Sequence, residues 1–344
     1  MLPTIAVVIP NRNDSVFLAD CLASVLRQSV RPDQIIFIDD QSSDDSLMKA
    51  RAMLNGVCGV TILANASCVG AMETINRGLG QATCDYVLFL SSNDAIENEL
   101  IAQAKLSMAK FLRPGIWSAM AWLVDVNGRR KYIYPTPVIA LSDTYVSPKE
   151  CARLALKHGN WFTGPTLMFH RESLQRLGGF NAKHFGLADL FAALGISSFR
   201  GAVFCPQPLG IMRMHSHGYL RSTLTNLENL EAILAEIKVA YGGFSPEIFT
   251  DKFCDRTKHR IRFASLRAAK GELVPFPGSW VGARYYLLNV GRSLFNPMLG
   301  PMVVLAFILL RPFDIIPCIR SKLFPGIYIN LKNIFRFSER IQNI

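Results

Sequence analysis

The sequence lacks several features that would each point to a particular class of protein. Its eight cysteines are scattered and form no CxxC pair, which argues against a zinc site or a disulfide framework. Several of them stand in apolar runs and are expected to be small core residues in a reducing compartment. Met1 to Thr4 lead into an apolar run without a basic stretch, so no signal peptide is expected. Internal repeats and low-complexity linkers are also missing.

Positive charge is concentrated near the end of the chain. The 344 residues carry a net charge of +11 and are 50% hydrophobic, enough for one large α/β domain with an extension. Residues 251–344 hold 15 Lys and Arg against 5 Asp and Glu, a net charge of +10, which leaves +1 for the first 250 residues. This asymmetry indicates a basic C-terminal region with an anionic partner.

The first hundred residues alternate between short apolar runs and segments of helical periodicity. Strands are predicted at 4–10, 34–39, 59–63 and 85–91, and helices at 15–28, 44–54, 69–81 and 97–111. Strands joined by helices form a parallel sheet. Ligands bind beyond the carboxyl ends of such strands, where Asn11 to Asp14 and Asp39 to Ser43 are expected to lie.

The middle of the chain is expected to continue this α/β domain. Residues 115–145 are strand-rich, and Asn127-Gly128 between two β-runs is typical of a hairpin. Further along, a strand is predicted at 164–170, and helices at 148–158, 171–177 and 186–195.

The composition changes after about residue 225. Leu227 to Val239 is predicted to form an amphipathic helix and Lys252 to Lys270 a basic one. Leu294 to Leu310 is a 17-residue run without charge. It is shorter than the roughly 20 residues of a spanning helix and contains prolines, which favours a re-entrant or interfacial segment. Ile327 to Ile344 is predicted to be a basic amphipathic helix on an anionic membrane surface. The alternative is a helical pair packed on the catalytic domain.

Five segments, in the right order, carry a resemblance to a known family. They are Ile5 to Asp14 with Ile35 to Asp45, Asn65 to Gly70, Ile75 to Leu79, Asp85 to Asp94, and Gly178 to Asn181 followed by Ala188-Asp189. Together they resemble the family-2 glycosyltransferases of the GT-A fold over roughly residues 3 to 220. The resemblance implies an α/β, Rossmann-like mixed sheet flanked by helices, followed by a helical, basic C-terminal extension. It divides the chain into a GT-A domain at 1–225, with a nucleotide-binding half at 1–95 and an acceptor half at 96–225, and an extension at 226–344.

The resemblance also implies an activity. The protein is expected to move a sugar, with inversion, from a nucleoside-diphosphate sugar to a hydroxyl of a glycan or lipid-linked acceptor, in surface polysaccharide or glycolipid synthesis. A UDP-sugar is the favoured donor. The expected location is the cytoplasmic face of the plasma membrane, held peripherally by the anionic lipid surface. Nucleic acid is not an expected partner, because the basic residues alternate with aliphatic runs. The sequence leaves the oligomeric state open.

Base recognition falls, by resemblance, to the first two strand ends. Asp39 and Asp40 stand where the family places a carboxylate that accepts the uracil N3–H, and Asp40 is the better candidate. Pro10 and Arg12 lie in the first turn, where the family usually has an aromatic residue that stacks on the base. A guanidinium plane can also stack on a base. The alternative for the aspartates is helix capping.

The DxD position departs most from the family. Here Ser91-Ser92-Asn93-Asp94 replaces the usual Asp-x-Asp-Asp. Ser92 and Asn93 are expected to line the donor site. Mn²⁺ or Mg²⁺ prefers carboxylate oxygens, so Asp94 would take over the metal, with Asn93 and His215 or His217 assisting. Two alternatives stay open: Arg or Lys balances the diphosphate, or the protein is catalytically weak or inactive.

Asp189 is the expected catalytic base, by its place after Gly178-Gly179-Phe180. A carboxylate within hydrogen-bond reach of the acceptor hydroxyl can take its proton. The alternative is an ordinary helix N-terminal aspartate, which the helix dipole favours. Trp161 and Phe162 are expected on the acceptor side, either stacking on a sugar ring or filling the core.

Two other classes of protein compete with this interpretation. A non-catalytic GT-A-like binding or scaffold protein would explain the loss of the DxD carboxylates. A nucleotidyltransferase would usually need a glycine-rich loop after the first strand, and Pro10 to Asn13 contain no glycine.

Overall fold

The computed structural model describes residues 2–111, 113–134, 136–213 and 230–269. The N-terminal half alternates strands and helices as the periodicity predicts. Its elements are β1 (Ile5–Asn11), α1 (Ser15–Leu26), β2 (Gln34–Asp39), α2 (Ser46–Leu54), β3 (Val60–Ala64), α3 (Ala71–Gln81), β4 (Tyr86–Phe89), β5 (Ala95–Ile96) and α4 (Leu100–Lys110).

The second half adds strands to the same sheet and further helices. Its elements are β6 (Ile116–Val124), β7 (Arg130–Ile133), β8 (Thr144–Val146), α5 (Pro148–His158), η1 (Gly164–Thr166), β9 (Met168–His170), α6 (Arg171–Arg176), η2 (Ala182–Leu187), α7 (Ala188–Arg200), β10 (Ala202–Arg213), α9 (Leu230–Gly242) and α10 (Asp251–Ala269). The predicted hairpin is present as β6–β7. The predicted strand at 164–170 is shorter, because its first residues form the 3₁₀ turn η1.

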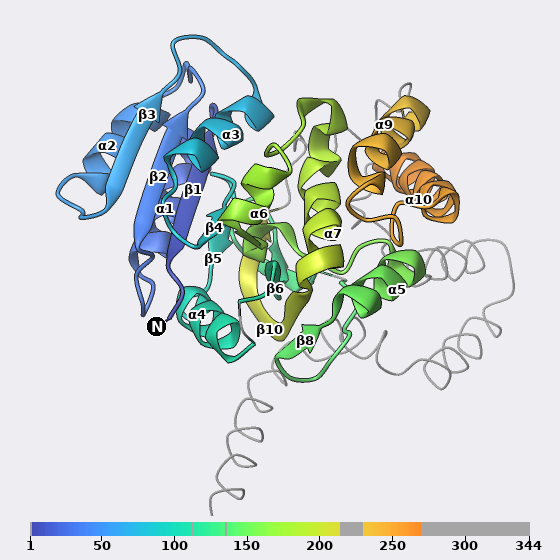
Figure 1. Cartoon of the computed structure of the whole chain (residues 1–344). Coiled ribbons are helices and arrows are strands. Elements are labelled where there is room, and N and C mark those ends of the chain that lie inside the picture. Colours follow the sequence, from blue (N-terminus) through green and yellow to red (C-terminus); the bar gives the residue numbers. More distant parts are fainter. Residues whose placement is uncertain (1, 112, 135, 214–229, 270–344) are drawn as a thin grey trace, which may run out of the picture.

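One mixed sheet runs through both halves (Figure 1). Its strand order is β3-β2-β1-β4-β9-β6-β10-β5, with β7 on β6 and β8 on β10. The first four strands are parallel, and β9 joins them antiparallel to β4. The carboxyl ends of β1 and β2 therefore lie side by side, with Asn11 opposite Asp39. The expected mixed α/β architecture is confirmed.

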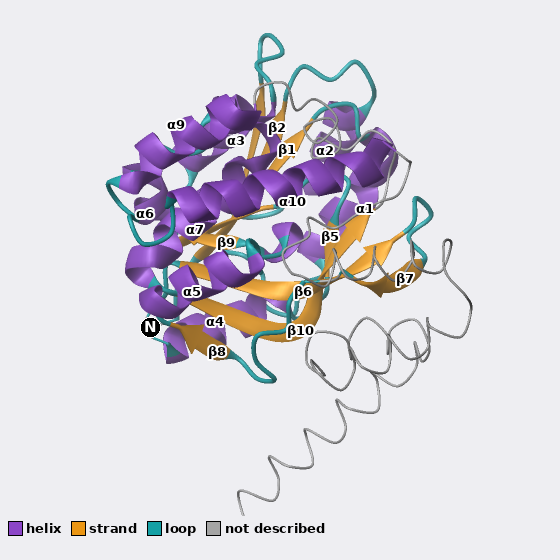
Figure 2. Ribbon diagram, turned by 90° about the vertical axis from the view of Figure 1, so that its right-hand side faces the viewer, coloured by secondary structure: helices purple, strands orange, loops and turns teal. Residues whose placement is uncertain are grey.

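Alternate residues of β1 feed two separate cores. Ala6 and Val8 pack into the larger cluster, while Ile5, Val7 and Ile9 pack into the other. Because side chains alternate across a strand, a fully buried parallel strand needs apolar residues at every position. Helices accordingly cover both faces of the sheet, as the two views show (Figures 1 and 2).

Strand β10 was not predicted, although it is the longest strand of the sheet. Pro206 and Pro208 interrupt its sequence, and proline normally argues against a central strand because it cannot donate to the ladder. The register with β6 shifts between Cys205 and Pro208 and again between Pro208 and Gly210. These irregularities let the strand continue past its prolines to Arg213.

The helices α9 and α10 form a pair beside α5 and α7 (Figure 1). Arg256 donates to the carbonyl of Leu156 at 2.8 Å, and Arg260 donates to the same carbonyl and to that of Lys157. These are the last carbonyls of α5, where cations are favoured by the helix dipole. This part of the basic region thus packs on the α/β domain. The predicted segments at 294–310 and 327–344, and the predicted boundary at residue 225, lie outside the described residues.

No helix in the described part of the chain combines the length and hydropathy needed to cross a bilayer.

His184 in η2 is a buried imidazole without a hydrogen-bond partner among the described residues. It is 1% exposed and contacts the rings of Phe191 and Tyr241. Burial lowers its pKa below the ordinary 6.5; nearby Glu236 opposes this, and Lys183 adds to it. The native state therefore holds a neutral ring that becomes charged on unfolding in acid.

We expect His184→Phe to increase the free energy of unfolding by about 1 kcal/mol at neutral pH, because an unsatisfied polar group is removed. Below about pH 6.5 the parent should lose stability as protons favour its unfolded state, and the variant should lose less. Urea unfolding between pH 5 and 7.5 measures both effects. His170, whose pKa is also lowered, to about 4, remains as an internal reference in both proteins. An unchanged pH slope in the variant would contradict the assignment.

Candidate active site at the carboxyl edge of the sheet

The ends of β1 and β2 are joined by buried polar side chains. Asn11 donates through Nδ2 to Asp39 Oδ1 at 2.9 Å and to Ser42 Oγ at 3.1 Å. The other oxygen of Asp39 accepts the Ser42 amide at 2.8 Å. Asp39 is 2% exposed. It therefore fixes the loop after β2, which resembles the capping alternative more than a direct contact with a base.

Asp40 anchors the loop before α3. Its Oδ1 accepts from Asn65 Nδ2 and the Val69 amide at 2.8 and 2.9 Å. Its Oδ2 accepts from the Gly70 amide at 2.9 Å and from Cys68 Sγ at 3.5 Å. Burial alone would raise the pKa of this carboxyl, but the hydrogen bonds from Val69, Asn65 and Gly70 together lower it.

This arrangement corrects the expectation for Asp40. A carboxylate offers about four acceptor positions, and four donors already occupy those of Asp40. The side chain is 3% exposed. In this structure Asp40 shapes the loop around the expected base site and presents no open acceptor to a base.

Arg12 and Pro10 lie beside that loop. Arg12 is exposed, and its guanidinium contacts the thiol of Cys68, while Pro10 is partly buried at the end of β1. Two non-glycine residues here adopt left-handed backbone conformations, Asn13 with φ 56° and Gln41 with φ 54°. Gln41 Oε1 accepts the Cys68 amide at 2.9 Å. The structure thus brings Arg12, Asp39 and Asp40 to one edge. Left-handed conformations of non-glycine residues, as at Asn13 and Gln41, cluster at functional sites.

The turn that replaces the DxD motif is held by its own side chains. Ser91 donates to Asn93 Oδ1 at 2.6 Å, and Ser92 donates to Asp14 Oδ2 at 2.7 Å. Ser92 is 1% exposed and Asn93 9% exposed. Ser92 is therefore committed to Asp14, a residue to which the sequence had assigned no role. The only feature of the sequence that pointed to Asp14 was its position at the end of the polar turn after β1.

Asp94 is the carboxylate of this turn. Its Oδ1 accepts the Arg213 amide at 2.8 Å. Burial raises the pKa of Asp94 to about 7; Arg213 opposes this shift and Asp14 adds to it. Within the described residues, no group of three or more His, Cys, Asp or Glu side chains could hold a metal ion. His215 lies outside these residues.

The turn offers a single carboxylate, Asp94, to a Mg²⁺ or Mn²⁺ ion. Such an ion takes few protein ligands and completes its shell with diphosphate oxygens and water. Asp94, a half-buried carboxylate that desolvation disfavours in its charged form, would gain from a cation beside it. Asp94 would hold that ion, with the amide of Asn93 adjacent.

Two of the family-like segments meet through reciprocal hydrogen bonds. Asn76 of α3 donates to the carbonyl of Phe180 and accepts the Phe180 amide, both at 2.8 Å, across 104 residues. A Cβ on Gly179, which has φ 78°, would lie 2.5 Å from Asn76 Oδ1. Gly78, on the same helix, faces Val8 and Ile38 so closely that a Cβ there would clash with both. These contacts fix the segment that leads to Asp189 against α3, in the N-terminal half of the chain.

Asp189 is the second residue of α7. Its Oδ1 accepts the Leu190 amide at 2.7 Å, and its side chain is accessible to solvent. Desolvation by the surrounding protein nevertheless raises the pKa of its carboxyl, against the hydrogen bond from Leu190. Just before it, Phe185 is an exposed aromatic residue with φ 51° and ψ −140°. An accessible carboxylate with a raised pKa is suited to accept a proton.

Trp161 and Phe162 belong to the core, which corrects the acceptor-side expectation. They are 0% and 3% exposed, and their ring centroids lie 4.0 Å apart. Both pack in the larger hydrophobic cluster. Neither ring presents a face on which a sugar could stack.

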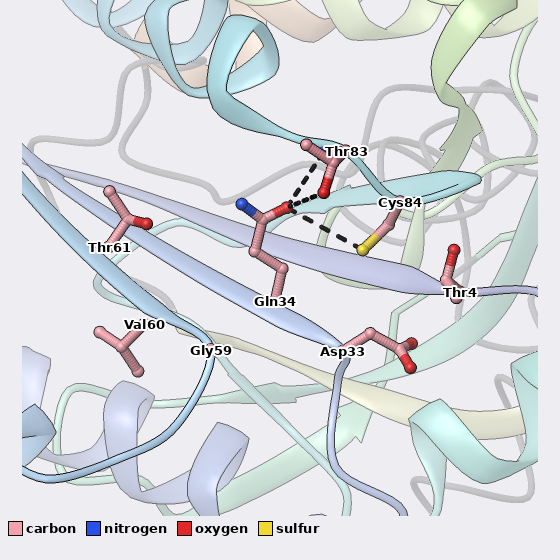
Figure 3. A pocket seen from close by; sticks show the side chains of 8 residues that line it. All are labelled: Thr4, Asp33, Gln34, Gly59, Val60, Thr61, Thr83 and Cys84. Carbon is pink, nitrogen blue, oxygen red and sulfur yellow. Dashed lines mark hydrogen bonds between the residues drawn. The ribbon is translucent and has the colours of Figure 1, made fainter.

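A cavity of about 480 Å³ lies at the opposite edge of the sheet, by the amino ends of β1 to β4 (Figure 3). Its lining includes Thr4, Asp33, Gln34 and Cys84. Gln34 Oε1 accepts from the amide of Thr83, as the dashed lines show. Parallel α/β sheets bind ligands at the carboxyl edge, so we assign no substrate to this cavity.

Comparisons with known proteins agree with this arrangement. Residues 6–112 match the model of glycosyl transferase family 2. An uncharacterized glycosyltransferase of Haemophilus influenzae is 26% identical over 186 residues, which cover 53% of this chain and 68% of that protein.

Two solved structures share the fold at 16% sequence identity. S. aureus TarS 1–349 in complex with UDP-GlcNAc has a TM-score of 0.58, and the aligned region covers 78% of this chain and 73% of the TarS chain. The mannosyltransferase PcManGT of Pyrobaculum calidifontis, in complex with GDP-Man and Mn²⁺, has a TM-score of 0.55. The aligned region covers 95% of this chain and 88% of the PcManGT chain. The match over residues 6–112 and the GT-A fold shared with these structures support a family-2 glycosyltransferase.

Proposed function

We propose that this glycosyltransferase transfers a sugar, with inversion, from a nucleoside-diphosphate sugar to a hydroxyl of a glycan or lipid-linked acceptor. The observation that carries the proposal is Asp189, an accessible carboxylate of raised pKa on a segment fixed to the nucleotide-binding half through Asn76. Asp189 would take the proton of the acceptor hydroxyl as its oxygen attacks the anomeric carbon from the face opposite the diphosphate. The anomeric C–O bond then breaks, and the nucleoside diphosphate leaves with the electron pair.

The donor side is proposed to lie along the ends of β1 and β2 and the Ser91–Asp94 turn. Arg12 would stack on or donate to the base, since a guanidinium offers a flat face and only donors. A divalent cation at Asp94, when bound, would neutralise charge on the leaving diphosphate. The solved relatives with UDP-GlcNAc, or with GDP-Man and Mn²⁺, support a nucleotide-sugar donor of this general class. A UDP-sugar remains the favoured donor.

The acceptor and location are proposed from charge. A net +10 on residues 251–344 suits an anionic membrane surface on the cytoplasmic side, and a lipid-linked acceptor would be available there. The catalytic domain would be held peripherally at this surface. Surface polysaccharide or glycolipid synthesis is the kind of process that uses such an acceptor.

A non-catalytic binding protein is the second candidate. Ser91 and Asn93 stand in place of carboxylates, and Ser92 is bonded to Asp14. This observation specifically favours a degenerate site.

Thermal unfolding with UDP, GDP, ADP and their sugars, each with and without Mn²⁺ or Mg²⁺, tests the proposal. A nucleotide that binds only the folded state should stabilise it by about 2.7 kcal/mol at 100 times its dissociation constant. We expect one base to stand out and the metal to increase the shift. Selective binding without any transfer to added acceptors would favour the binding protein, and no shift with any nucleotide would contradict the donor site.

A further inference from the structure

Arg213 is a buried arginine at the end of β10, and each of its three guanidinium nitrogens donates a hydrogen bond. Its side chain is 5% exposed. Nε donates to the carbonyl of Asn93 at 3.1 Å, Nη1 to the carbonyl of Val126 at 3.0 Å, and Nη2 to Asp20 Oδ2 at 3.0 Å. The guanidinium carbon lies 4.9 Å from the ring centroid of Phe17.

These contacts join three segments that are remote in the sequence. Asn93 and Asp94 lie in the turn after β4, Asp20 and Phe17 lie on α1, and Val126 lies in the β6–β7 hairpin. The Arg213 backbone adds a fourth bond, because its amide donates to Asp94 Oδ1 at 2.8 Å. One residue thus holds both the carbonyl of Asn93 and the carboxylate of Asp94.

Stability alone is a weak reason for such a residue. Burying a guanidinium carries a large desolvation cost, and apolar residues of similar volume often serve a core equally well. The guanidinium forms an ion pair with Asp20, whose side chain is 69% exposed, so that ion pair contributes little. What an apolar residue cannot do is donate to the Asn93 carbonyl of the turn while separate donors tie it to the β6–β7 hairpin and to α1.

We propose that Arg213 is a positioning residue that sets the Ser91–Asp94 turn so that Asp94 meets the diphosphate and its cation. This inference rests on the proposed donor site and assigns to it a residue from the acceptor half. Arg213 itself does not touch the substrate. It acts through the orientation of Asn93 and Asp94.

The planar fork of arginine is essential to this role. A lysine at the same place keeps the charge but offers a single ammonium, which cannot reach Asn93, Val126 and Asp20 together. Arg213→Lys should therefore loosen the turn while the backbone bond to Asp94 remains possible. The base side of the donor site, at Arg12 and the Asp40 loop, has no contact with Arg213 among those described.

The test compares binding of a nucleoside with binding of its diphosphate, by calorimetry, in Mn²⁺ and in chelator. The nucleoside of the base preferred by the parent probes the base side alone, and the diphosphate also probes the turn. For Arg213→Lys we expect diphosphate affinity in Mn²⁺ to fall about 10–100-fold, the range found when groups that orient a metal ligand are removed. Nucleoside affinity should stay within about twofold. In transfer assays kcat should fall, while the KM for the acceptor should change less.

Arg130→Lys is the matched control. Arg130 also pairs with an acid, Glu97, and lies over an aromatic ring, Trp122, at 4.8 Å, but it has no contact with the turn. It should leave both affinities unchanged. An Asp20→Asn variant tests the exposed ion pair and should change diphosphate affinity by less than about threefold.

The inference is overturned if Arg213→Lys loses nucleoside and diphosphate affinity equally, which is the signature of a general structural defect. It is also overturned if the variant keeps full diphosphate affinity in Mn²⁺. In both cases the parent still binds the diphosphate, so the proposed donor site stands. A parent that binds neither ligand would remove the donor site and this inference with it.

Discussion

Replacing Asp189 with asparagine is expected to lower kcat for sugar transfer by about 10²–10⁴-fold, the contribution usual for a positioned general base. The amide keeps the size of the carboxylate and an acceptor oxygen for the Leu190 amide, so the first turn of α7 should form normally. It cannot take a proton from the acceptor hydroxyl. Initial rates at saturating donor and acceptor, together with nucleotide affinity, measure the change.

The pH dependence of the parent gives a second measure of the same residue. The base must be ionised to act, and desolvation raises the pKa of Asp189 above the ordinary 3.8. The rate should therefore fall on the acid side at a higher pH than an aspartate with the ordinary pKa of 3.8 would give. Asp189→Asn should lose this acid limb together with the activity.

Asp251→Asn is the matched control for Asp189. Asp251 is also an acidic residue in the first turn of a helix, α10, and its side chain is 84% exposed. It shares the interaction with a helix dipole but lies outside the proposed site. Full activity in Asp251→Asn and none in Asp189→Asn would separate catalysis from helix stabilisation. An Asp189→Asn enzyme with parental kcat would exclude Asp189 as the base.

Replacing Asp40 with asparagine is expected to decrease the free energy of unfolding by about 2–4 kcal/mol and to abolish nucleotide binding. Asp40 now accepts hydrogen bonds from Val69, Gly70 and Asn65. The NH₂ group of an asparagine would face one of these donors and could not accept its hydrogen bond. Buried donors left without an acceptor cost about 1–3 kcal/mol each, and bonds to a charged acceptor are the stronger ones. Urea unfolding and calorimetric titration with nucleotide measure the two effects.

The sign of the pH effect for Asp40 is opposite to that for His184. The hydrogen bonds lower the pKa of Asp40 from the ordinary 3.8, so its contribution is complete above that value. It should be lost as the pH falls through the lowered pKa, and Asp40→Asn should lack this loss. Asp45→Asn is the control, because Asp45 is an exposed neighbour whose carboxylate pairs with Lys49 on the surface. Equal stability of the two variants would show that the loop does not depend on Asp40.

Much of the fold follows from local patterns. The apolar runs at β1, β2, β3 and β4 and the helical spacing between them identify a parallel sheet, because period and length are properties of neighbouring residues. The order of the family-like segments was also sufficient to place Asp39, Asp40 and the Ser91–Asp94 turn at one edge. β10 escaped this approach, because its two prolines are compatible with a central strand only when bulges in its pairing with β6 absorb them.

The site shows more clearly where local patterns stop being sufficient. The sequence around Trp161 and Phe162 is compatible both with stacking on a sugar ring and with burial in the core. Only their packing in the larger hydrophobic cluster shows that they belong to the core. Asp40 had the right position for base recognition, but its role depends on which donors surround it, and these come from residues 65 to 70.

The sequence by itself predicted the parallel strands β1 to β4 and their carboxyl edge, and the family resemblance indicated Asp189 as the candidate base. These depend on periodicity and on short segments in a fixed order. The tertiary structure alone decided which polar groups meet: Asn76 with Phe180, Ser92 with Asp14, and Arg213 with Asn93 and Asp94. Such pairs form between residues some 80 to 120 positions apart, so no local pattern encodes them, and burial fixes them because each buried polar atom needs a partner.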